Sequence, residues 1–249
     1  MAVEAARDLL GTDEDRSHID ALFFGSTTMP FKDRLNAGII SAALTLGENI
    51  RAVDVASTQR AGTSALMQAL TTVKAGEAKN AIVVASDHRK TRAASAQELD
   101  FGDGAAALSV GSDNVIATYL GGTSLTIDFV DHFRGGTDDF DYNWEERWIR
   151  DEGYTKIIPR AVKAALEASG TAAGDIKHFV LPTTFGVKFV QQLAKASGIA
   201  PDAARDTLAD NCGETGAAHS LVMLVHTLQK EAKPGDKIVV LHFGGGCDA

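Results

Sequence analysis

Apolar residues recur at intervals of three and four along several segments of the chain. This spacing places the apolar side chains on one face of an α-helix, because the helix repeats every 3.6 residues. The predicted helices cover residues 1–10, 36–46, 63–75, 153–169, 188–197 and 217–230.

Short runs of apolar and β-branched residues lie between these segments and predict strands. The predicted strands cover residues 21–25, 52–55, 80–85, 105–111, 115–122, 178–181 and 237–243. Residues 81–85 (AIVVA) and 238–242 (IVVLH) are almost entirely apolar, which is typical of central strands covered on both faces. Helices that alternate with such strands indicate an α/β fold.

Two stretches of the chain follow the same plan and predict an internal duplication. In each, a helix leads through a short Asp-containing loop to an apolar strand, a second helix and a Gly-containing turn. The predicted organisation is an N-terminal half over residues 1–127, a polar and aromatic insertion over 128–150, and a C-terminal half over 151–249. The insertion holds both tryptophans. It is either a surface excursion that covers the core or a lid or pocket wall.

Charge and composition exclude several classes of protein. The chain has 249 residues and a net charge of −9, so it lacks the basic surface of a nucleic-acid-binding protein. No apolar run approaches the roughly 18 residues of a membrane span. The two cysteines cannot form a disulfide framework, and the N-terminus has no secretion signal. We therefore expect a cytoplasmic protein that binds neither nucleic acid nor membrane.

The segment 53–66 (VDVASTQRAGTSAL) predicts a strand, a tight turn and a helix of small residues. A side chain at such a turn lies at a helix N-terminus, where the helix dipole favours negative charge, and catalytic thiolates are often placed this way. The segment resembles the nucleophile turn of the thiolase superfamily, in particular of hydroxymethylglutaryl-CoA synthases and ketoacyl synthase III. Their pattern is approximately D-x-x-x-A-C-x-A/G-G-T. Alignment on Asp54, Ala61, Gly62 and Thr63 puts Gln59 where the family has its cysteine.

Other landmarks of the family follow in the expected order. Residues 101–107 (FGDGAAA) resemble its glycine-rich strand entry, and residues 233–236 (KPGD) resemble the approach to its closing strand. The loop Gly244, Gly245 and Gly246 resembles the loop that supplies a backbone oxyanion donor, because glycine leaves the approach to the N–H groups open.

The remaining two catalytic positions of the family are also substituted. In the family, the catalytic histidine follows a strand and precedes a helix that ends near the pattern A-K-x-x-G. This pattern is found at residues 194–198, and counting back from it places Thr183 at the position of the histidine. The sequence GETGAA at 213–218 places Glu214 at the asparagine of G-N-T-x-x-A. The resemblance therefore implies that Gln59, Thr183 and Glu214 stand where the family has Cys, His and Asn.

These substitutions limit the chemistry. A glutamine amide cannot form an acyl-enzyme, although Gln59 can still donate an N–H to a thioester carbonyl. Glu214 is either a general base, if burial raises its proton affinity, or a carboxylate favoured by a helix N-terminus. Cys212 and His219 flank Glu214 and are either a substitute nucleophile and base or ordinary packing residues. Cys247, close to the glycine loop, is more simply a packed thiol.

Further polar residues have alternative roles. Arg60, Arg134 and Arg150 are either solvated cations or partners for a CoA phosphate or a substrate carboxylate. Residues 87–90 correspond to a family loop near the dimer partner and the pocket. His178, His226 and His242 are most simply structural, and neither CxxC nor HExxH spacing occurs, so no metal site is expected.

The resemblance implies a thiolase-like α-β-α-β-α layered sandwich with duplicated halves. The family's chains begin and end with strands that are missing here, so we expect truncation at both ends. The implied ligand is a coenzyme A thioester, with no covalently bound cofactor.

The implied partners are a second copy or another thiolase-fold chain, and a zinc-ribbon/OB-fold module as relatives carry. Two functions stay open: an atypical acyltransferase of the hydroxymethylglutaryl-CoA synthase type, or a non-catalytic subunit that pairs with an active thiolase. A dinucleotide-dependent oxidoreductase is disfavoured, because no G-x-G-x-x-G follows a first strand.

Overall fold

The computed structural model describes residues 1–12 and 15–249, which form two compact units. Unit 1 comprises Met1–His88, Asp103–Tyr119 and Thr215–Val222, and unit 2 comprises Arg89–Gly102, Leu120–Glu214 and Met223–Ala249. Each unit is thus assembled from three separate stretches of chain. The units do not coincide with the continuous halves 1–127 and 151–249, so the duplication stays a prediction.

A four-stranded sheet with the order β2-β1-β3-β4 is the centre of unit 1. Its strands are β1 (Ala21–Gly25), β2 (Arg51–Val55), β3 (Ala81–Asp87) and β4 (Gly104–Val110). The first three run parallel and β4 runs antiparallel to β3. Every residue of β1 and β3 is buried, as the apolar run 81–85 predicts.

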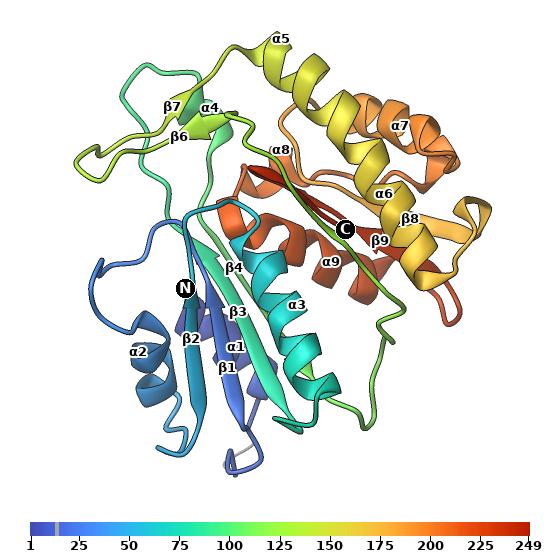
Figure 1. Ribbon diagram of the computed structural model, residues 1–249. Helices are drawn as coiled ribbons and strands as arrows, with labels where there is room; N and C mark the ends of the chain where they lie inside the picture. The colour runs from blue at the N-terminus through green and yellow to red at the C-terminus, as the bar shows by residue number, and fades with distance from the viewer. Residues whose placement is uncertain (13–14) are drawn as a thin grey trace. The chain divides into compact units, whose positions relative to one another are not determined.

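Helices cover both faces of this sheet (Figure 1). Phe23 and Val83 pack on one face against α3 (Ala61–Lys74) and the start of α9 (His219–Lys230). Leu22 and Phe24 pack on the other face against α1 (Ala2–Leu10) and α2 (Asn36–Ala43). Side chains alternate across the strands, so both faces of the sheet need an apolar cover.

The predicted strand over residues 115–122 is wrong. No strand forms between β4 and β5 (Ser124–Thr126), and the side chains of Ile116 and Leu120 are exposed. Apolar and β-branched residues favour a strand only where a neighbouring strand supplies pairing and burial, and this stretch has neither in the described structure.

Unit 2 contains three small sheets. β8 (Ile176–Val180) pairs in parallel with β9 (Lys237–Val240). The three-stranded sheet β10-β11-β5 is antiparallel, with β10 at His242–Phe243 and β11 at Gly246–Asp248. The hairpin of β6 (His132–Phe133) and β7 (Tyr142–Asn143) lies in the predicted insertion 128–150.

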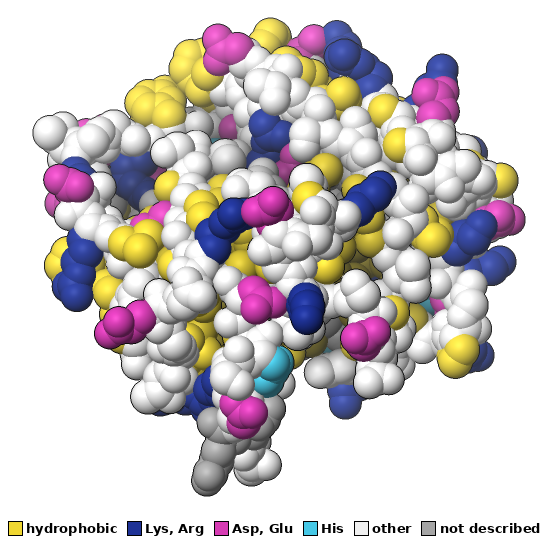
Figure 2. All heavy atoms as spheres, turned by 60° about the horizontal axis from the view of Figure 1, so that its bottom comes forward, with side chains coloured by type: hydrophobic (Ala, Val, Ile, Leu, Met, Phe, Trp, Pro, Cys, Tyr) yellow, Lys and Arg dark blue, Asp and Glu magenta, His cyan; other side chains and the backbone are white. Residues whose placement is uncertain are grey.

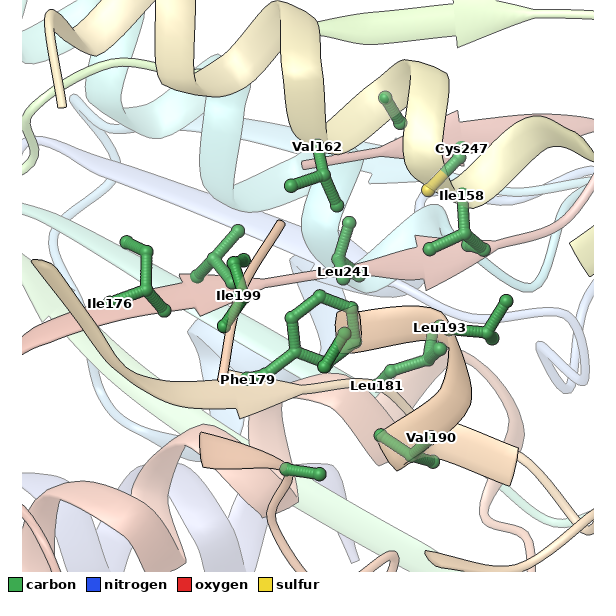
Figure 3. Packing of buried hydrophobic residues seen from close by; sticks show 14 of the residues in the cluster. Ile158, Val162, Ile176, Phe179, Leu181, Val190, Leu193, Ile199, Leu241 and Cys247 are labelled. Atoms are coloured by element: carbon green, nitrogen blue, oxygen red, sulfur yellow. The ribbon is translucent and has the colours of Figure 1, made fainter. Parts of the chain in front are cut away.

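The helices of unit 2 complete its core. The longer ones are α6 (Thr155–Ser169) and α7 (Val187–Ala196), and the short ones are α4 (Gln97–Asp100), α5 (Glu146–Trp148) and α8 (Ala209–Cys212). A π-helical turn (Ile149–Tyr154) leads into α6. Ile158, Phe179, Leu193 and Leu241 meet in one apolar cluster between α6, α7 and the strands (Figure 3).

Side chains of both charge signs are interspersed among apolar ones on the face seen in Figure 2. None of the helices within the described residues has the length and apolar character needed to cross a lipid bilayer.

Candidate functional site

Gln59 lies in the turn between β2 and α3, as the sequence predicts. The turn is tight, since Ser57 takes a left-handed backbone conformation with φ of 69°. The backbone of Ala217 packs closely against Gly62, near the start of α3. If Gly62 carried a Cβ, that atom would lie only 2.1 Å from the carbonyl oxygen of Ala217, so a larger residue does not fit there. The segment thus forms the sharp strand-to-helix turn that the sequence predicts, and the side chain of Gln59 at this turn is a partly buried amide.

Asp54, the first residue of the nucleophile pattern, has a structural task. Its carboxylate accepts the backbone N–H groups of Asn36 at 2.8 Å and Ala37 at 2.7 Å. These are N–H groups at the start of α2, which have no acceptor within the helix. Asp54 therefore caps α2 from a neighbouring strand.

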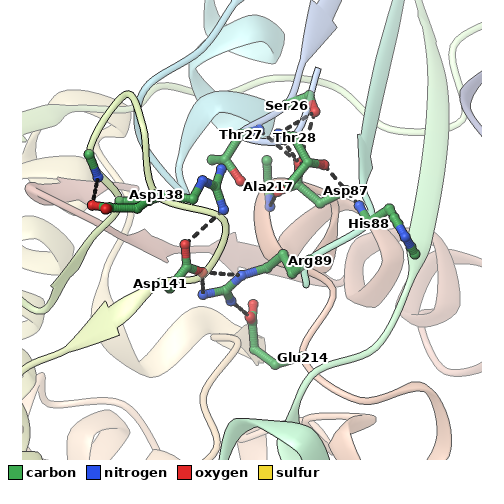
Figure 4. A network of polar contacts seen from close by, with 12 residues as sticks. Ser26, Thr27, Thr28, Asp87, His88, Arg89, Asp138, Asp141, Glu214 and Ala217 are labelled. Atoms are coloured by element: carbon green, nitrogen blue, oxygen red, sulfur yellow. Dashed lines mark hydrogen bonds and ion pairs between the residues drawn. The ribbon is translucent and has the colours of Figure 1, made fainter. Parts of the chain in front are cut away.

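Glu214 is part of a buried chain of charged groups in unit 2 (Figure 4). Its Oε2 accepts from Nη1 of Arg89, and the Nε and Nη2 of Arg89 donate to Oδ2 of Asp141 at 3.1 and 2.7 Å. Oδ1 of Asp141 accepts from Nη1 of Arg134 at 2.7 Å. The side chains of Arg89, Asp141 and Glu214 are 2%, 4% and 10% exposed. Two cations and two carboxylates alternate, so the formal charges of the cluster cancel.

The backbone around Glu214 is also held firmly. Its N–H donates to the carbonyl of Asp100 at 2.7 Å, and its own carbonyl accepts from Gly102 at 3.0 Å. The guanidinium of Arg89 lies 3.5 Å over the ring of Phe101, a cation–π contact. Arg89 thus packs against the same segment that fixes the Glu214 backbone.

Thr183 follows β8 and is buried. Its Oγ1 accepts the backbone N–H of Phe185 at 3.1 Å, and the ring of Phe185 meets that of Tyr154 with centroids 5.6 Å apart. Burial raises the pKa of Tyr154 far above its ordinary value, and the negative charges of Asp131 and Glu214 raise it further. Within unit 2 Phe185 thus links Thr183 to Tyr154, a neighbour that sequence reasoning missed.

Cys212 and His219 belong to different units. Sγ of Cys212, at the end of α8, lies 3.4 Å from the carbonyl oxygen of Leu208. Burial and then the charge of Glu214 raise the pKa of the Cys212 thiol, which disfavours the reactive thiolate. Nδ1 of His219 accepts the backbone N–H of Thr215 at 3.0 Å. A joint catalytic role of the two stays a prediction.

The glycine loop forms the turn between β10 and β11. Gly245 and Gly246 have φ of 60° and 115°, and a Cβ on Gly246 would lie 1.9 Å from the carbonyl oxygen of Leu125 in β5. The N–H of Gly244 donates to the carbonyl of Gly246 at 3.0 Å. Cys247 is fully buried in the apolar core of unit 2.

The candidate arginines have different surroundings. Arg134 joins the buried charge cluster, whereas Arg150 pairs with Asp151 at 2.7 Å on the surface. Arg60 is the partly buried residue that precedes α3. Of the three, Arg60 alone lies in the same turn as Gln59.

Asp87, at the end of β3 in unit 1, accepts six hydrogen bonds (Figure 4). The donors are the hydroxyl of Ser26, the N–H and hydroxyl groups of Thr27 and Thr28, and the N–H of Ala217, at 2.7 to 3.1 Å. The sequence contains a signal for this cluster, because polar residues come at or directly after the ends of two strands. The carboxyl ends of adjacent parallel strands meet at one edge of a sheet, so these residues can be expected to lie together. Asp87 thus ties the ends of β1 and β3 to the turn before α9.

The histidines expected to be structural have local contacts or are buried. Nε2 of His178 lies 3.0 Å from Asp236, and Nε2 of His226 lies 3.5 Å from Glu231. His242 is buried in β10. Among residues 1–12 and 15–249, no three His, Cys, Asp or Glu side chains gather into a group that could hold a metal ion.

Comparison with solved structures defines the fold. The 3-oxoacyl-(acyl carrier protein) synthase III of Pseudomonas aeruginosa matches with a TM-score of 0.85 at 21% identity, over 99% of this chain and 80% of that one. OleA of Xanthomonas campestris, in a structure with lauric acid and lauroyl-CoA, matches with a TM-score of 0.80 at 23% identity, over 99% and 79%. The predicted α/β thiolase-like fold is therefore confirmed.

Sequence comparison defines the family. Residues 166–249 match the family model for the C-terminal part of 3-oxoacyl-[acyl-carrier-protein] synthase III. The hydroxymethylglutaryl-CoA synthase of Methanosphaera stadtmanae is 30% identical over 99% of this chain and 71% of its own length. That of Methanocella arvoryzae is 30% identical over 99% and 70%. The chain belongs to the hydroxymethylglutaryl-CoA synthase family.

Proposed function

We propose that this chain binds acyl-CoA thioesters without forming an acyl-enzyme, as a subunit that pairs with a catalytically active chain of the same fold. Support for the ligand comes from relatives named hydroxymethylglutaryl-CoA synthase and from the lauroyl-CoA in the OleA structure. Gln59, at the turn where the family has its cysteine, lacks a nucleophilic atom that could take up the acyl group.

The observation that carries the proposal is the ion pair of Glu214 with Arg89. A general base must reach the substrate proton with a free lone pair. Here one carboxylate oxygen is engaged by a guanidinium that is itself bound to Asp141. If Glu214 abstracted a proton from the substrate, its carboxylate would become neutral. The buried guanidinium of Arg89 would then lose the negative charge that stabilises it. The pairing favours a structural role over the alternative, an atypical enzyme that uses Glu214 as base.

Exchange of the α-hydrogens of bound acetyl-CoA in D₂O separates the two functions. We expect acetyl-CoA and longer acyl-CoAs to protect the protein against thermal unfolding, with no exchange above the buffer rate. The Glu214→Gln variant should show the same background exchange. Suppose instead that the wild-type chain catalyses the exchange. If Glu214→Gln then abolishes the exchange and the matched control Glu231→Gln retains it, Glu214 is the base and the proposed non-catalytic role is refuted. Absence of binding by every acyl-CoA would refute the proposed ligand.

A further inference from the structure

We propose that the exposed rings of the β6–β7 hairpin bind an arginine-bearing, positively charged segment of a partner protein. The rings are those of Phe133, Tyr142 and Trp144, and together they are called the aromatic face. This inference goes beyond the acyl-CoA binding proposed above and does not depend on it.

The hairpin places the three rings in a row. Phe133 of β6 lies opposite Tyr142 of β7 in the strand register, and their ring centroids are 5.1 Å apart. The N–H of Trp144 donates to the carbonyl of Asp131 at 2.8 Å, which continues the pairing by one residue beyond β7. The ring of Trp144 meets that of Tyr142 with centroids 6.2 Å apart. Residues two positions apart on a strand point to the same face, so the three rings form one continuous surface.

The aromatic face lies at the surface of unit 2. Phe133, Tyr142 and Trp144 are each about half exposed. Single exposed apolar residues are ordinary on a protein, whereas exposed apolar residues that adjoin one another mark an interaction site. Tyr and Trp are also the residue types that most often supply the binding energy at interfaces. The aromatic face is therefore a candidate docking surface.

The residues next to these rings hold the hairpin in place (Figure 4). Arg134 follows Phe133, Asp141 precedes Tyr142, and both side chains belong to the buried charge cluster. Asp141 accepts from Arg134 at 2.7 Å and from Nη2 of Arg89 at 2.7 Å. The hairpin is thus anchored by ion pairs on the residues that alternate with its rings. A surface fixed in this way loses little conformational freedom when a partner binds.

The charge of the insertion defines the partner. Residues 128–150 contain seven Asp or Glu residues and three Arg residues, and each of these arginines lies within 3.3 Å of a carboxylate. The exposed carboxylates of this stretch are Asp128, Asp138, Asp139, Glu145 and Glu146. A negative rim beside exposed rings complements a positively charged segment, and it repels the phosphates of coenzyme A and anionic lipid headgroups.

Arginine suits this surface better than lysine. Its planar guanidinium stacks on ring faces while its N–H groups donate to carboxylates, and it is more weakly hydrated than an ammonium group. The insertion already contains one contact of this kind, because the guanidinium of Arg92 lies 5.9 Å from the centroid of the Phe140 ring. An arginine from a partner would make the same contact on the exposed rings.

Binding of an N-acetylated octapeptide of alternating glycine and arginine tests the proposal, with the corresponding glycine–lysine peptide as the probe of equal charge. The chain has two tryptophans, so the Trp148→Phe variant leaves Trp144 as the sole fluorophore of its kind. We expect the arginine peptide to change the Trp144 emission saturably and to protect Trp144 from quenching by acrylamide. Calorimetry should give it about 2- to 5-fold higher affinity than the lysine peptide. Equal affinities or an unchanged Trp144 emission would overturn the proposal.

Replacement of the central ring locates the contact. Tyr142→Thr should weaken binding of the arginine peptide about 2- to 5-fold, while Tyr142→Phe, which keeps the ring, should bind as the wild type does. Tyr119→Thr is the matched control, because Tyr119 is similarly exposed but belongs to unit 1. Binding that Tyr142→Thr leaves unchanged would overturn the proposal.

Removal of two charges from the rim tests the electrostatic part. Asp139→Asn/Glu146→Gln should weaken binding, whereas Asp113→Asn/Asp210→Asn, which removes two exposed charges outside the insertion, should weaken it less. Equal losses in the two double variants would show that net charge alone attracts the peptide and would overturn the assigned surface.

Other occupants of the aromatic face give different results. Dimers in sedimentation experiments that Tyr142→Thr dissociates, together with no binding of the arginine peptide, would assign the face to a second copy of this chain. Binding to phosphatidylcholine/phosphatidylglycerol vesicles that the same variant abolishes would assign it to a lipid surface. Either result would overturn the proposal and leave the acyl-CoA binding of the proposed function intact.

Discussion

Replacement of Arg89 by Met tests whether the buried charge cluster stabilises the fold around Glu214. The substitution removes the guanidinium and leaves an unbranched apolar side chain, while Asp141 keeps its contact with Arg134. Glu214 loses the guanidinium that pairs with it in the cluster, at a site where its side chain is 10% exposed. Removal of one partner from a buried ion pair costs about 3–5 kcal/mol, and we expect a loss of that size in the free energy of unfolding.

Urea denaturation followed by circular dichroism measures this loss, and calorimetry should show a melting temperature lower by about 6–20 °C. Arg51→Met is the matched control, because Arg51 and Glu77 are 51% and 63% exposed and lie 3.3 Å apart. Such a surface pair contributes at most about 1 kcal/mol. The double variant Arg89→Met/Glu214→Gln should be more stable than Arg89→Met, since it removes the uncompensated charge. A loss in Arg89→Met no larger than that of the control would refute this account of the cluster.

Three further predictions concern single residues. Gly246→Ala should destabilise the protein by a few kcal/mol, because its φ of 115° and the close carbonyl of β5 leave no room for a Cβ; Gly174→Ala, with nothing within 4 Å of the added atom, is the control in a thermal melt. Asp87→Asn should cost about 2–4 kcal/mol in urea denaturation, because an amide nitrogen cannot accept the donors that now bind the carboxylate; equal stability with the exposed control Asp113→Asn would contradict this. Backbone N–H donors hold the pKa of Asp20 below 3.8, so its stabilisation is present above that pH and is lost as pH falls through the lower folded value; the stability difference between wild type and Asp20→Asn should shrink below pH 4, and a difference independent of pH would refute it.

The sequence predicts the parts of the fold that depend on local patterns. The strand 21–25 is found at those residues, and the helix predicted over 188–197 is found at Val187–Ala196. Local apolar patterns determine these elements, a continuous apolar run for the strand and a spacing of three and four for the helix, so the sequence is sufficient. The strand predicted over 115–122 fails because its formation depends on a partner strand, which a local pattern does not contain.

The candidate site likewise contains a part that local sequence predicts and a part that depends on distant residues. The turn at Gln59 follows from a contiguous motif and is found between β2 and α3. The pairing of Arg89 with Glu214 joins residues 125 positions apart, and the ring contact of Phe185 with Tyr154 also depends on tertiary placement. Sequence reasoning treated Glu214 as a base or a helix-end carboxylate, because nothing local to it indicates a buried arginine.

Intact-mass spectrometry after incubation with acetyl-CoA and longer acyl-CoAs tests the central claim most directly. The chain should be incubated alone and with any protein that co-purifies with it. We predict an unchanged mass for this chain, with any acyl adduct confined to the partner. A stable acyl adduct on this chain, at Cys212 or Cys247 for example, would show that another residue has replaced the missing nucleophile and would contradict the account.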